Sequence, residues 1–207
     1  APTRAACETI ELAVQLHLDT LLQREHGEEI IELAGAGKGF GIVAGTGTGK
    51  TLAIRPIAET ILGTTDLRVG VVNREREATP ETPSWNVVIV TTGIARRWFQ
   101  DGDISPRDTL IVDEIHQTSA ELELCLALGK RVGSRFIWLS ATVDPTFYAQ
   151  YLGSSAVLET TAFDPEKAAD VTHVHRTPLD FLTGSDFRAV QKESPGVGRG
   201  RPPRAAG

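Results

Sequence analysis

The chain has 207 residues, of which 41% are hydrophobic and 23% are charged. These proportions are typical of a globular protein that buries a sizeable core, and they exclude a largely disordered chain. The 21 lysines and arginines against 27 aspartates and glutamates give a formal net charge of −6, which argues against capture of a polyanion by the whole surface but not against a local nucleic-acid groove.

Several function classes are disfavoured by the pattern of apolar residues and cysteines. No apolar run approaches the ~18 residues that a membrane-spanning helix needs, and the N-terminus lacks the features of a secretion signal. Two cysteines, Cys7 and Cys125, are too few for a disulfide framework or a four-cysteine zinc site. We therefore expect a soluble, intracellular protein of the cytoplasm that has no membrane partner. The absence of methionine indicates a processed chain or a fragment of a longer one.

The apolar spacing predicts two N-terminal helices, over 5–24 and 28–34, followed by alternating strands and helices. The later strands are apolar throughout, as expected where helices cover both faces of a sheet. This pattern predicts an α/β fold with a mostly parallel sheet. The expected strands are 40–43, 68–73, 87–91, 109–113, 135–140 and 156–159, and the expected helices are 50–62, 94–99, 119–128 and 146–152.

The length predicts one full domain plus a remainder, because domains usually hold ~150 residues. We assign the domain to residues 1–160 and a linker or tail, partly disordered, to residues 161–207. The periodicity fades in the tail, and its end is rich in glycine, proline and arginine.

A glycine-rich loop lies between the strand over 40–43 and the helix that follows it. Its glycines allow successive amide groups to point at phosphate oxygens, and the helix adds its positive N-terminal end. Lys50 would pair with the β- and γ-phosphates, and the Thr51 hydroxyl would ligate Mg²⁺. The alternative is an ordinary glycine-rich turn. The predicted ATP-binding loop, of Walker A type, is Ala44-Gly45-Thr46-Gly47-Thr48-Gly49-Lys50-Thr51.

A carboxylate pair, Asp113 and Glu114, ends the strand over 109–113. Parallel sheets bind ligands at the carboxyl ends of their strands, which favours a shared site with the glycine-rich loop. Asp113 would hold Mg²⁺ through water, and Glu114 would position and deprotonate an attacking water. The alternative is a strand that ends in solvated acids. We assign neither His173 nor His175 to metal binding.

Together, the loop, Asp113-Glu114-Ile115-His116 and Ser140-Ala141-Thr142 resemble motifs I, II and III of the superfamily 2 DExH-box helicases. Thr91-Thr92-Gly93 is similar to motif Ib of that family. The resemblance extends over residues 35–152 and implies the first of two RecA-like domains that clamp ATP and a single strand of nucleic acid.

The resemblance also implies roles for individual residues. Lys50, Thr51, Asp113 and Glu114 would serve the nucleotide. His116, Ser140 and Thr142 would couple the state of the nucleotide to strand binding. Thr91, Thr92, Gly93 and, more weakly, Arg74 would contact the sugar-phosphate backbone.

The chain departs from the family at two places. The stretch after the strand over 68–73 is Asn73-Arg74-Glu75-Arg76-Glu77, whose acids should reduce phosphate attraction. The residues after 161 are too few for a second RecA-like domain, which supplies arginine fingers in this family. We interpret Arg199, Arg201 and Arg204 as part of a solvated tail, and expect the chain alone to hydrolyse ATP weakly.

The sequence thus predicts an ATP hydrolase whose cofactors are ATP and Mg²⁺ and whose partner is single-stranded RNA or DNA. Two alternatives remain open. One is a phosphate-loop NTPase that makes no contact with nucleic acid, and the other is a nucleotide-binding remnant without catalysis.

Overall fold

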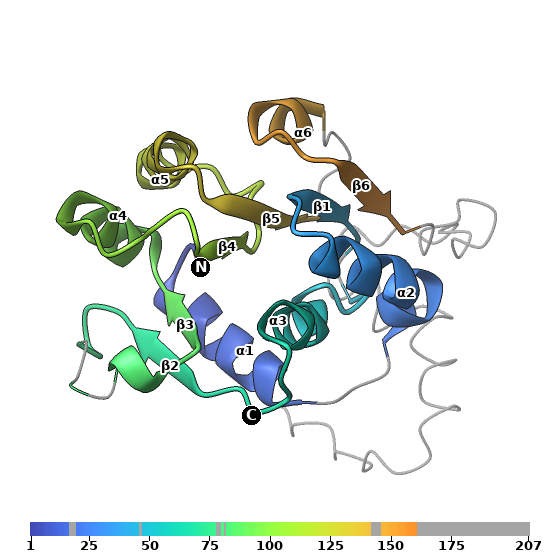
Figure 1. Ribbon diagram of the computed structural model, residues 1–207, viewed down its shortest axis with the longest axis horizontal. Coiled ribbons are helices and arrows are strands. Elements are labelled where there is room, and N and C mark those ends of the chain that lie inside the picture. Colours follow the sequence, from blue (N-terminus) through green and yellow to red (C-terminus); the bar gives the residue numbers. More distant parts are fainter. Residues whose placement is uncertain (17–19, 46, 78–79, 81, 142–145, 161–207) are drawn as a thin grey trace, which may run out of the picture. The chain divides into compact units, whose positions relative to one another are not determined.

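Six short strands form two parallel sheets in the computed structural model, which describes residues 1–16, 20–45, 47–77, 80, 82–141 and 146–160 (Figure 1). The larger sheet has the order β4-β5-β1-β6, and the smaller one pairs β2 with β3. Every pairing is parallel, which confirms the predicted α/β class. The strands are β1 (Phe40–Val43), β2 (Val69–Val72), β3 (Val87–Val90), β4 (Thr109–Val112), β5 (Arg135–Ser140) and β6 (Ala156–Glu159).

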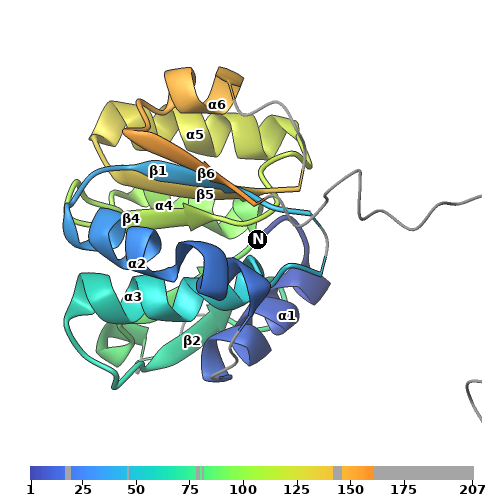
Figure 2. The same ribbon diagram turned by 90° about the vertical axis from the view of Figure 1, so that its right-hand side faces the viewer.

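Helices cover both faces of the larger sheet. Figure 2 shows α2 and α3 on one side of this sheet and α5 and α6 on the other. None of the helices in the described part of the chain is long and apolar enough to cross a membrane. The helices are α1 (Arg4–Gln15), α2 (Leu21–Gly35), α3 (Ile54–Leu62), α4 (Thr92–Asp101), α5 (Ala120–Val132) and α6 (Thr146–Tyr151), with short 3-10 turns η1 (Thr51–Ala53) and η2 (Thr82–Ser84).

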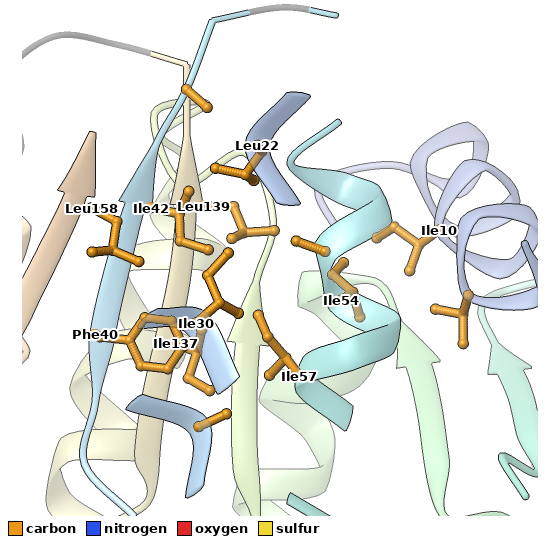
Figure 3. Packing of buried hydrophobic residues seen from close by; sticks show 14 of the residues in the cluster. Ile10, Leu22, Ile30, Phe40, Ile42, Ile54, Ile57, Ile137, Leu139 and Leu158 are labelled. Carbon is orange, nitrogen blue, oxygen red and sulfur yellow. The ribbon is translucent and has the colours of Figure 1, made fainter. Parts of the chain in front are cut away.

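The side chains of β5 alternate between two hydrophobic clusters, because successive strand residues point to opposite faces. Ile137 and Leu139 belong to the cluster under α1, α2 and α3, part of which is drawn in Figure 3. Phe136 and Trp138 belong to the cluster under α5 and α6. The two clusters fix the carboxyl ends of the strands, where the polar motifs begin.

The N-terminal helices differ from the prediction. Instead of one helix over 5–24 and another over 28–34, α1 ends at Gln15 and α2 begins at Leu21. The reason is the N-cap of α2, at which the Thr20 hydroxyl accepts a hydrogen bond from the Gln23 amide at 3.2 Å. The pattern Thr-x-x-Gln is a helix-start signal that interrupts the helical periodicity.

The division into two sheets also differs from the expected single sheet. At the carboxyl end of β3, the main chain of Ala1 takes the bonds that a neighbouring strand would otherwise make. Its amino group donates to the Val90 carbonyl at 2.9 Å, and the Thr92 amide donates to the Ala1 carbonyl at 3.2 Å. Figure 1 places this terminus beside β3, on the side towards β4.

Candidate functional site

The glycine-rich loop joins β1 to the helical turn η1. Gly47 and Gly49 have φ angles of 81° and 91°, in the left-handed region that favours glycine. The helical turn starts immediately after the loop, where the Ala53 amide donates to the carbonyls of Gly49 (3.2 Å) and Lys50 (3.1 Å). The amide groups before this first bond lack helical partners and therefore suit an anion.

One hydrogen bond within the loop, from the Thr48 amide to the Gly45 carbonyl, would have to break before a phosphate could accept a hydrogen bond from the Thr48 amide. The Thr48 amide donates to the Gly45 carbonyl at 3.3 Å, and the Thr48 hydroxyl donates to the same oxygen at 2.7 Å. Thr46 lies outside the described residues.

The start of α2 braces this loop through contacts that the sequence pattern did not predict. The Leu22 amide donates to the Thr48 carbonyl at 3.2 Å, and the Gln23 side-chain amide donates to the Leu52 carbonyl at 3.4 Å. A methyl group on Gly49 would lie 2.4 Å from Cβ of Thr20. Thr20 and Gln23 therefore position the loop, and the helix-start pattern they form was the signal that could have found them.

The strand-end acid Asp113 meets the loop directly. The Thr51 hydroxyl donates to Oδ2 of Asp113 at 3.2 Å, although the two residues are 62 positions apart in the chain. Asp113 is only 6% exposed. Burial raises the pKa of its carboxyl, and the nearby Glu114 acts in the same direction. A cation at this place would offset the cost of burying the carboxylate.

Lys50 is buried beside this pair, with 8% of its surface exposed. Its positive charge lowers the pKa of Asp113, against the larger effect of burial. No ion pair to Lys50 within 4 Å occurs among the residues that the structure describes. A buried ammonium without a close counter-ion favours binding of an anion.

Hard oxygen atoms make this site suitable for Mg²⁺. The Thr51 hydroxyl and the Asp113 carboxylate are ligands of the kind Mg²⁺ prefers. No group of three His, Cys, Asp or Glu side chains arranged for a metal was found within the described ranges. Mg²⁺ is usually held by one or two protein groups together with substrate phosphates, so these two residues fit it.

Glu114 adopts a backbone conformation that is unusual for a residue other than glycine. Its φ angle is 51°, and its amide donates to Oδ1 of Asp113 at 3.0 Å. Its carboxylate accepts a hydrogen bond from the side-chain amide of Gln117. Left-handed backbone at a non-glycine residue often marks a functional position. The strand thus turns sharply after Asp113, and Gln117 orients the Glu114 side chain.

His116 joins the end of β4 to the end of β5. Its Nδ1 accepts a hydrogen bond from the Ala141 amide at 3.2 Å and lies 3.4 Å from the Ser140 hydroxyl. Ser140 is buried, and the preceding residue of its strand, Leu139, accepts a bond from the Ile115 amide at 3.0 Å. Movement of one strand end would therefore be transmitted to the other. Thr142 lies outside the described residues.

A second site, a pocket of about 500 Å³, opens at the carboxyl ends of β2 and β3. We call it the arginine pocket. It brings together all four residues predicted to contact nucleic acid, and it adds residues 2–4 at the start of α1, further residues of α4 and Glu121 of α5. Its lining residues are Pro2, Thr3, Arg4, Asn73, Arg74, Glu75, Thr91, Thr92, Gly93, Ile94, Arg96, Arg97 and Glu121.

The arginine pocket is locally positive although the whole chain is acidic. Four arginines and two glutamates line it, a surplus of two positive charges against the net charge of −6 for the chain. Arg96 lies 3.8 Å from Glu121. Arg74 and Arg97 are exposed and form no ion pair with other described residues.

A buried contact holds Thr92, one of the residues that line the pocket. The thiol of Cys125 donates to the Thr92 carbonyl at 3.2 Å, which fastens α5 to the start of α4. Burial raises the pKa of this thiol to about 11, so the thiol remains a donor at neutral pH.

Comparisons with known proteins yield only distant structural similarity. No protein-family model and no curated protein matches the chain. Among solved structures, the chain is similar to the Hef helicase domain of Pyrococcus furiosus, with 19% identity, a TM-score of 0.47, and coverage of 69% of this chain and 39% of that one. It is also similar to a hypothetical ATP-dependent RNA helicase from Sulfolobus tokodaii, with 17% identity, a TM-score of 0.47, and coverage of 76% and 57%. The chain thus spans well under two thirds of either protein.

Proposed function

We propose that this chain is the ATP-binding, RecA-like domain of a DExH-type nucleic-acid helicase or translocase. The hydrogen bond between Thr51 and Asp113 carries the proposal, because it joins a phosphate-type loop to a strand-end acid in one site. The four predicted backbone-contacting residues share a separate pocket at the same ends of parallel strands. A protein that couples ATP hydrolysis to the binding of a nucleic-acid strand needs two sites of this kind.

The nucleotide-binding residues have distinct roles in this proposal. The main chain of residues 45–51 would hold the phosphates, and Lys50 would pair with their negative charge. Thr51 and Asp113 would hold Mg²⁺, which neutralises charge on the phosphate oxygens when bound. Glu114 would accept a proton from the attacking water, with Gln117 restraining one of its carboxylate oxygens.

Coupling would pass through His116. The Nδ1 atom of His116 accepts a hydrogen bond from the Ala141 amide. A movement of Glu114 that displaces His116 would therefore also displace the residues that follow β5. Ser140 lies at that junction, and Thr142 remains a prediction from the sequence. The strand-binding side would use the hydroxyls of Thr91 and Thr92 together with the amide of Gly93.

Full activity would need more than the described residues. In this family of enzymes an arginine finger from a second domain stabilises the transition state, typically by 10³-fold or more. Residues 161–207, assigned from sequence to a linker or tail, lie outside the described part of the chain. We therefore expect the chain to bind nucleotide and to turn it over slowly.

Binding experiments with a labelled single strand test the proposal. The chain should bind single-stranded RNA or DNA, and a nonhydrolysable ATP analogue with Mg²⁺ should change the affinity severalfold. In the Lys50→Ala variant the analogue should have no effect. Strand binding that is identical with and without the analogue in both proteins would contradict the coupling.

A phosphate-loop NTPase without a nucleic-acid partner is the second candidate. The pairing of Arg96 with Glu121 favours it, because a carboxylate in the arginine pocket repels phosphate. Nucleotide binding that depends on Lys50, combined with no strand binding even at low salt, would support this candidate instead.

A further inference from the structure

We propose that the N-terminal end of α1, residues 2–4, is part of the strand-binding surface, and that Arg4 is a phosphate-binding residue whose guanidinium is occupied by Glu75 until a strand binds. This inference rests on the proposed function and deepens it. The helicase resemblance begins at residue 35, so it assigns no role to α1. The structure nevertheless places Pro2, Thr3 and Arg4 in the wall of the arginine pocket.

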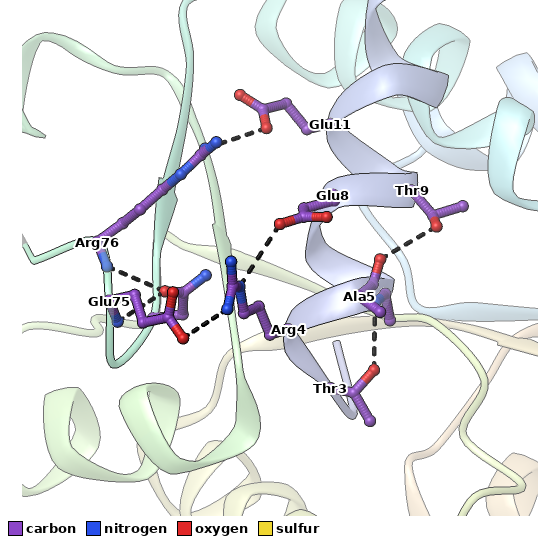
Figure 4. Close-up of polar contacts among 10 residues, drawn as sticks. Thr3, Arg4, Ala5, Glu8, Thr9, Glu11, Glu75 and Arg76 are labelled. Atoms are coloured by element: carbon purple, nitrogen blue, oxygen red, sulfur yellow. Dashed lines mark hydrogen bonds and ion pairs between the residues drawn. The ribbon is translucent and has the colours of Figure 1, made fainter.

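Arg4 is held between two carboxylates (Figure 4). Its guanidinium donates a hydrogen bond to Oε1 of Glu75, and its Nε lies 3.5 Å from Oε1 of Glu8. The side chains of Arg4 and Glu75 are 55% and 60% exposed. Exposed ion pairs of this kind contribute little to stability, so exchanging the Glu75 carboxylate for a phosphate would cost little.

The backbone around Glu75 is fixed by a turn rather than by this ion pair. The side-chain oxygen of Asn73 accepts hydrogen bonds from the amides of Glu75 and Arg76, both at 3.0 Å. The Asn73 amide donates to the Arg76 carbonyl at 2.8 Å, and Asn73 is 4% exposed. Release of Arg4 would therefore need only side-chain rotation.

The docking of α1 does not depend on Arg4 either. Cys7, Ile10 and Val14 are buried in the core on the inner side of the helix. A second ion pair of opposite polarity, Arg76 to Glu11 at 3.1 Å, joins the helix to the same turn. The helix would stay in place while Arg4 changes its partner.

The chemistry of the pocket indicates what Arg4 would bind. Arg74 and Arg97 supply two exposed cations, and the Thr91 and Thr92 hydroxyls supply neutral hydrogen-bonding groups. A sugar-phosphate backbone carries one negative charge per nucleotide, so successive phosphates would each pair with one of these cations. Arg4 would add one phosphate contact, and Glu75 would weaken binding by competing for the same guanidinium.

Substitution of Arg4 and substitution of Glu75 should change the affinity for a single strand in opposite directions. A labelled single strand of about 12 nucleotides would be titrated by fluorescence anisotropy against the full chain at several salt concentrations. Arg4→Gln should weaken binding by about threefold to tenfold at low salt, and the slope of log affinity against log salt should fall by about 0.7. Glu75→Gln should tighten binding by about twofold to fivefold, because Arg4 then has only Glu8 as a competing anion.

Controls distinguish this effect from a purely structural role of the ion pair and from a general effect of changing the net charge of the chain. A merely structural ion pair would give the same direction of change in both variants, and that result would overturn the proposal. Arg131→Gln and Glu28→Gln make the same charge changes at exposed positions outside the pocket. Effects no larger than in these controls would overturn it as well.

Arg97→Gln distinguishes failure of this inference from failure of the proposed function. Loss of affinity in Arg97→Gln with no change in Arg4→Gln and Glu75→Gln would leave the strand-binding proposal intact and refute the role of α1. Absence of strand binding by the unmodified chain would refute both.

Discussion

The glycine-rich loop and the arginine pocket lie at the same ends of parallel strands but are built differently. At the loop, Lys50 and Asp113 are 8% and 6% exposed, and main-chain geometry fixes the site. In the pocket, the charged groups are mostly exposed side chains held by other side chains. Desolvated charges are little screened by salt, whereas exposed charges are strongly screened. One region should therefore recognise its ligand by geometry and the other by graded electrostatic attraction.

The largest effect should follow from removing the buried ammonium. Lys50→Ala is expected to weaken ATP binding by about 100-fold, because a charge-assisted contact to phosphate is lost in a buried place. Strand binding without nucleotide should be unchanged. Isothermal titration with ATP and anisotropy with a single strand would measure the two affinities.

Lys38→Ala is the matched control, because Lys38 is exposed in the turn before β1. It should leave both affinities unchanged. A Lys50→Ala variant that loses strand binding as much as ATP binding would break the distinction between the two regions.

Two glycines of the loop should respond differently to alanine. Gly49→Ala would place a methyl group 2.4 Å from Thr20 at a φ of 91°, whereas at Gly47 the φ is 81° and no atom lies within 4 Å. Gly47→Ala should lower the free energy of unfolding by about 1 kcal/mol from backbone strain alone. Gly49→Ala should lower it by about 2–4 kcal/mol, because packing strain is added.

Urea denaturation followed by circular dichroism measures this difference. Equal losses in the two variants would show that the start of α2 does not brace the loop in solution.

Asp113→Asn should change the stability of the folded chain and its ATP binding in different ways. Burial raises the pKa of Asp113, so the folded chain holds this proton more tightly than the unfolded chain does. The stability linked to this proton is fully present below the unfolded pKa and is lost as the pH rises through the folded pKa. At neutral pH the asparagine variant should therefore be more stable than the unmodified chain without nucleotide.

The same variant should lose the dependence of ATP binding on Mg²⁺. Thermal denaturation between about pH 3 and pH 7, a range that begins below the ordinary aspartate pKa of about 3.9, would follow the stability difference. A variant less stable than the unmodified chain at neutral pH would contradict the view that this carboxylate is costly to bury.

The smallest expected effect concerns the arginine pocket. Arg97→Gln should weaken strand binding by about threefold at low salt, and the difference should disappear at high salt because the group is exposed. ATP binding without a strand should be unchanged. A loss of affinity that persists at high salt would mean that this region, like the loop, works by desolvated contacts.

The sequence predicted the strands well because buried parallel strands are continuous apolar runs. β1, β5 and β6 have the predicted bounds, and β3 and β4 differ by one residue at the end. The predicted position of the break between α1 and α2 was wrong: the prediction placed it after residue 24, whereas α1 ends at Gln15 and α2 begins at Leu21. Its cause is one side-chain cap, at Thr20, which competes with a helical periodicity that continues through the break.

The candidate sites were predictable where a motif is local and less so where tertiary packing decides. Residues 45–51 and Asp113 could be chosen from their positions after apolar strands. The sequence carries a helix-start signal at Thr20 and Gln23, but it does not show that these residues contact the loop. It carries no signal for Arg4, because Arg4 reaches its partner only through the packing of α1. Arg96 and Arg97 belong to a helix whose charged face has no signature that distinguishes a pocket from open surface.

The separation of β2 and β3 from the four-stranded sheet has a consequence for hydrogen exchange. These two strands bond to each other and pack under α1, whereas β1 lies between two neighbours in the larger sheet. Amide protons of β2 and β3 should therefore exchange with deuterium sooner than those of β1, and together with those of α1, as one subglobal opening unit. The side of the arginine pocket that β2, β3 and α1 form would then open while β1, the strand that leads into the glycine-rich loop, stays protected.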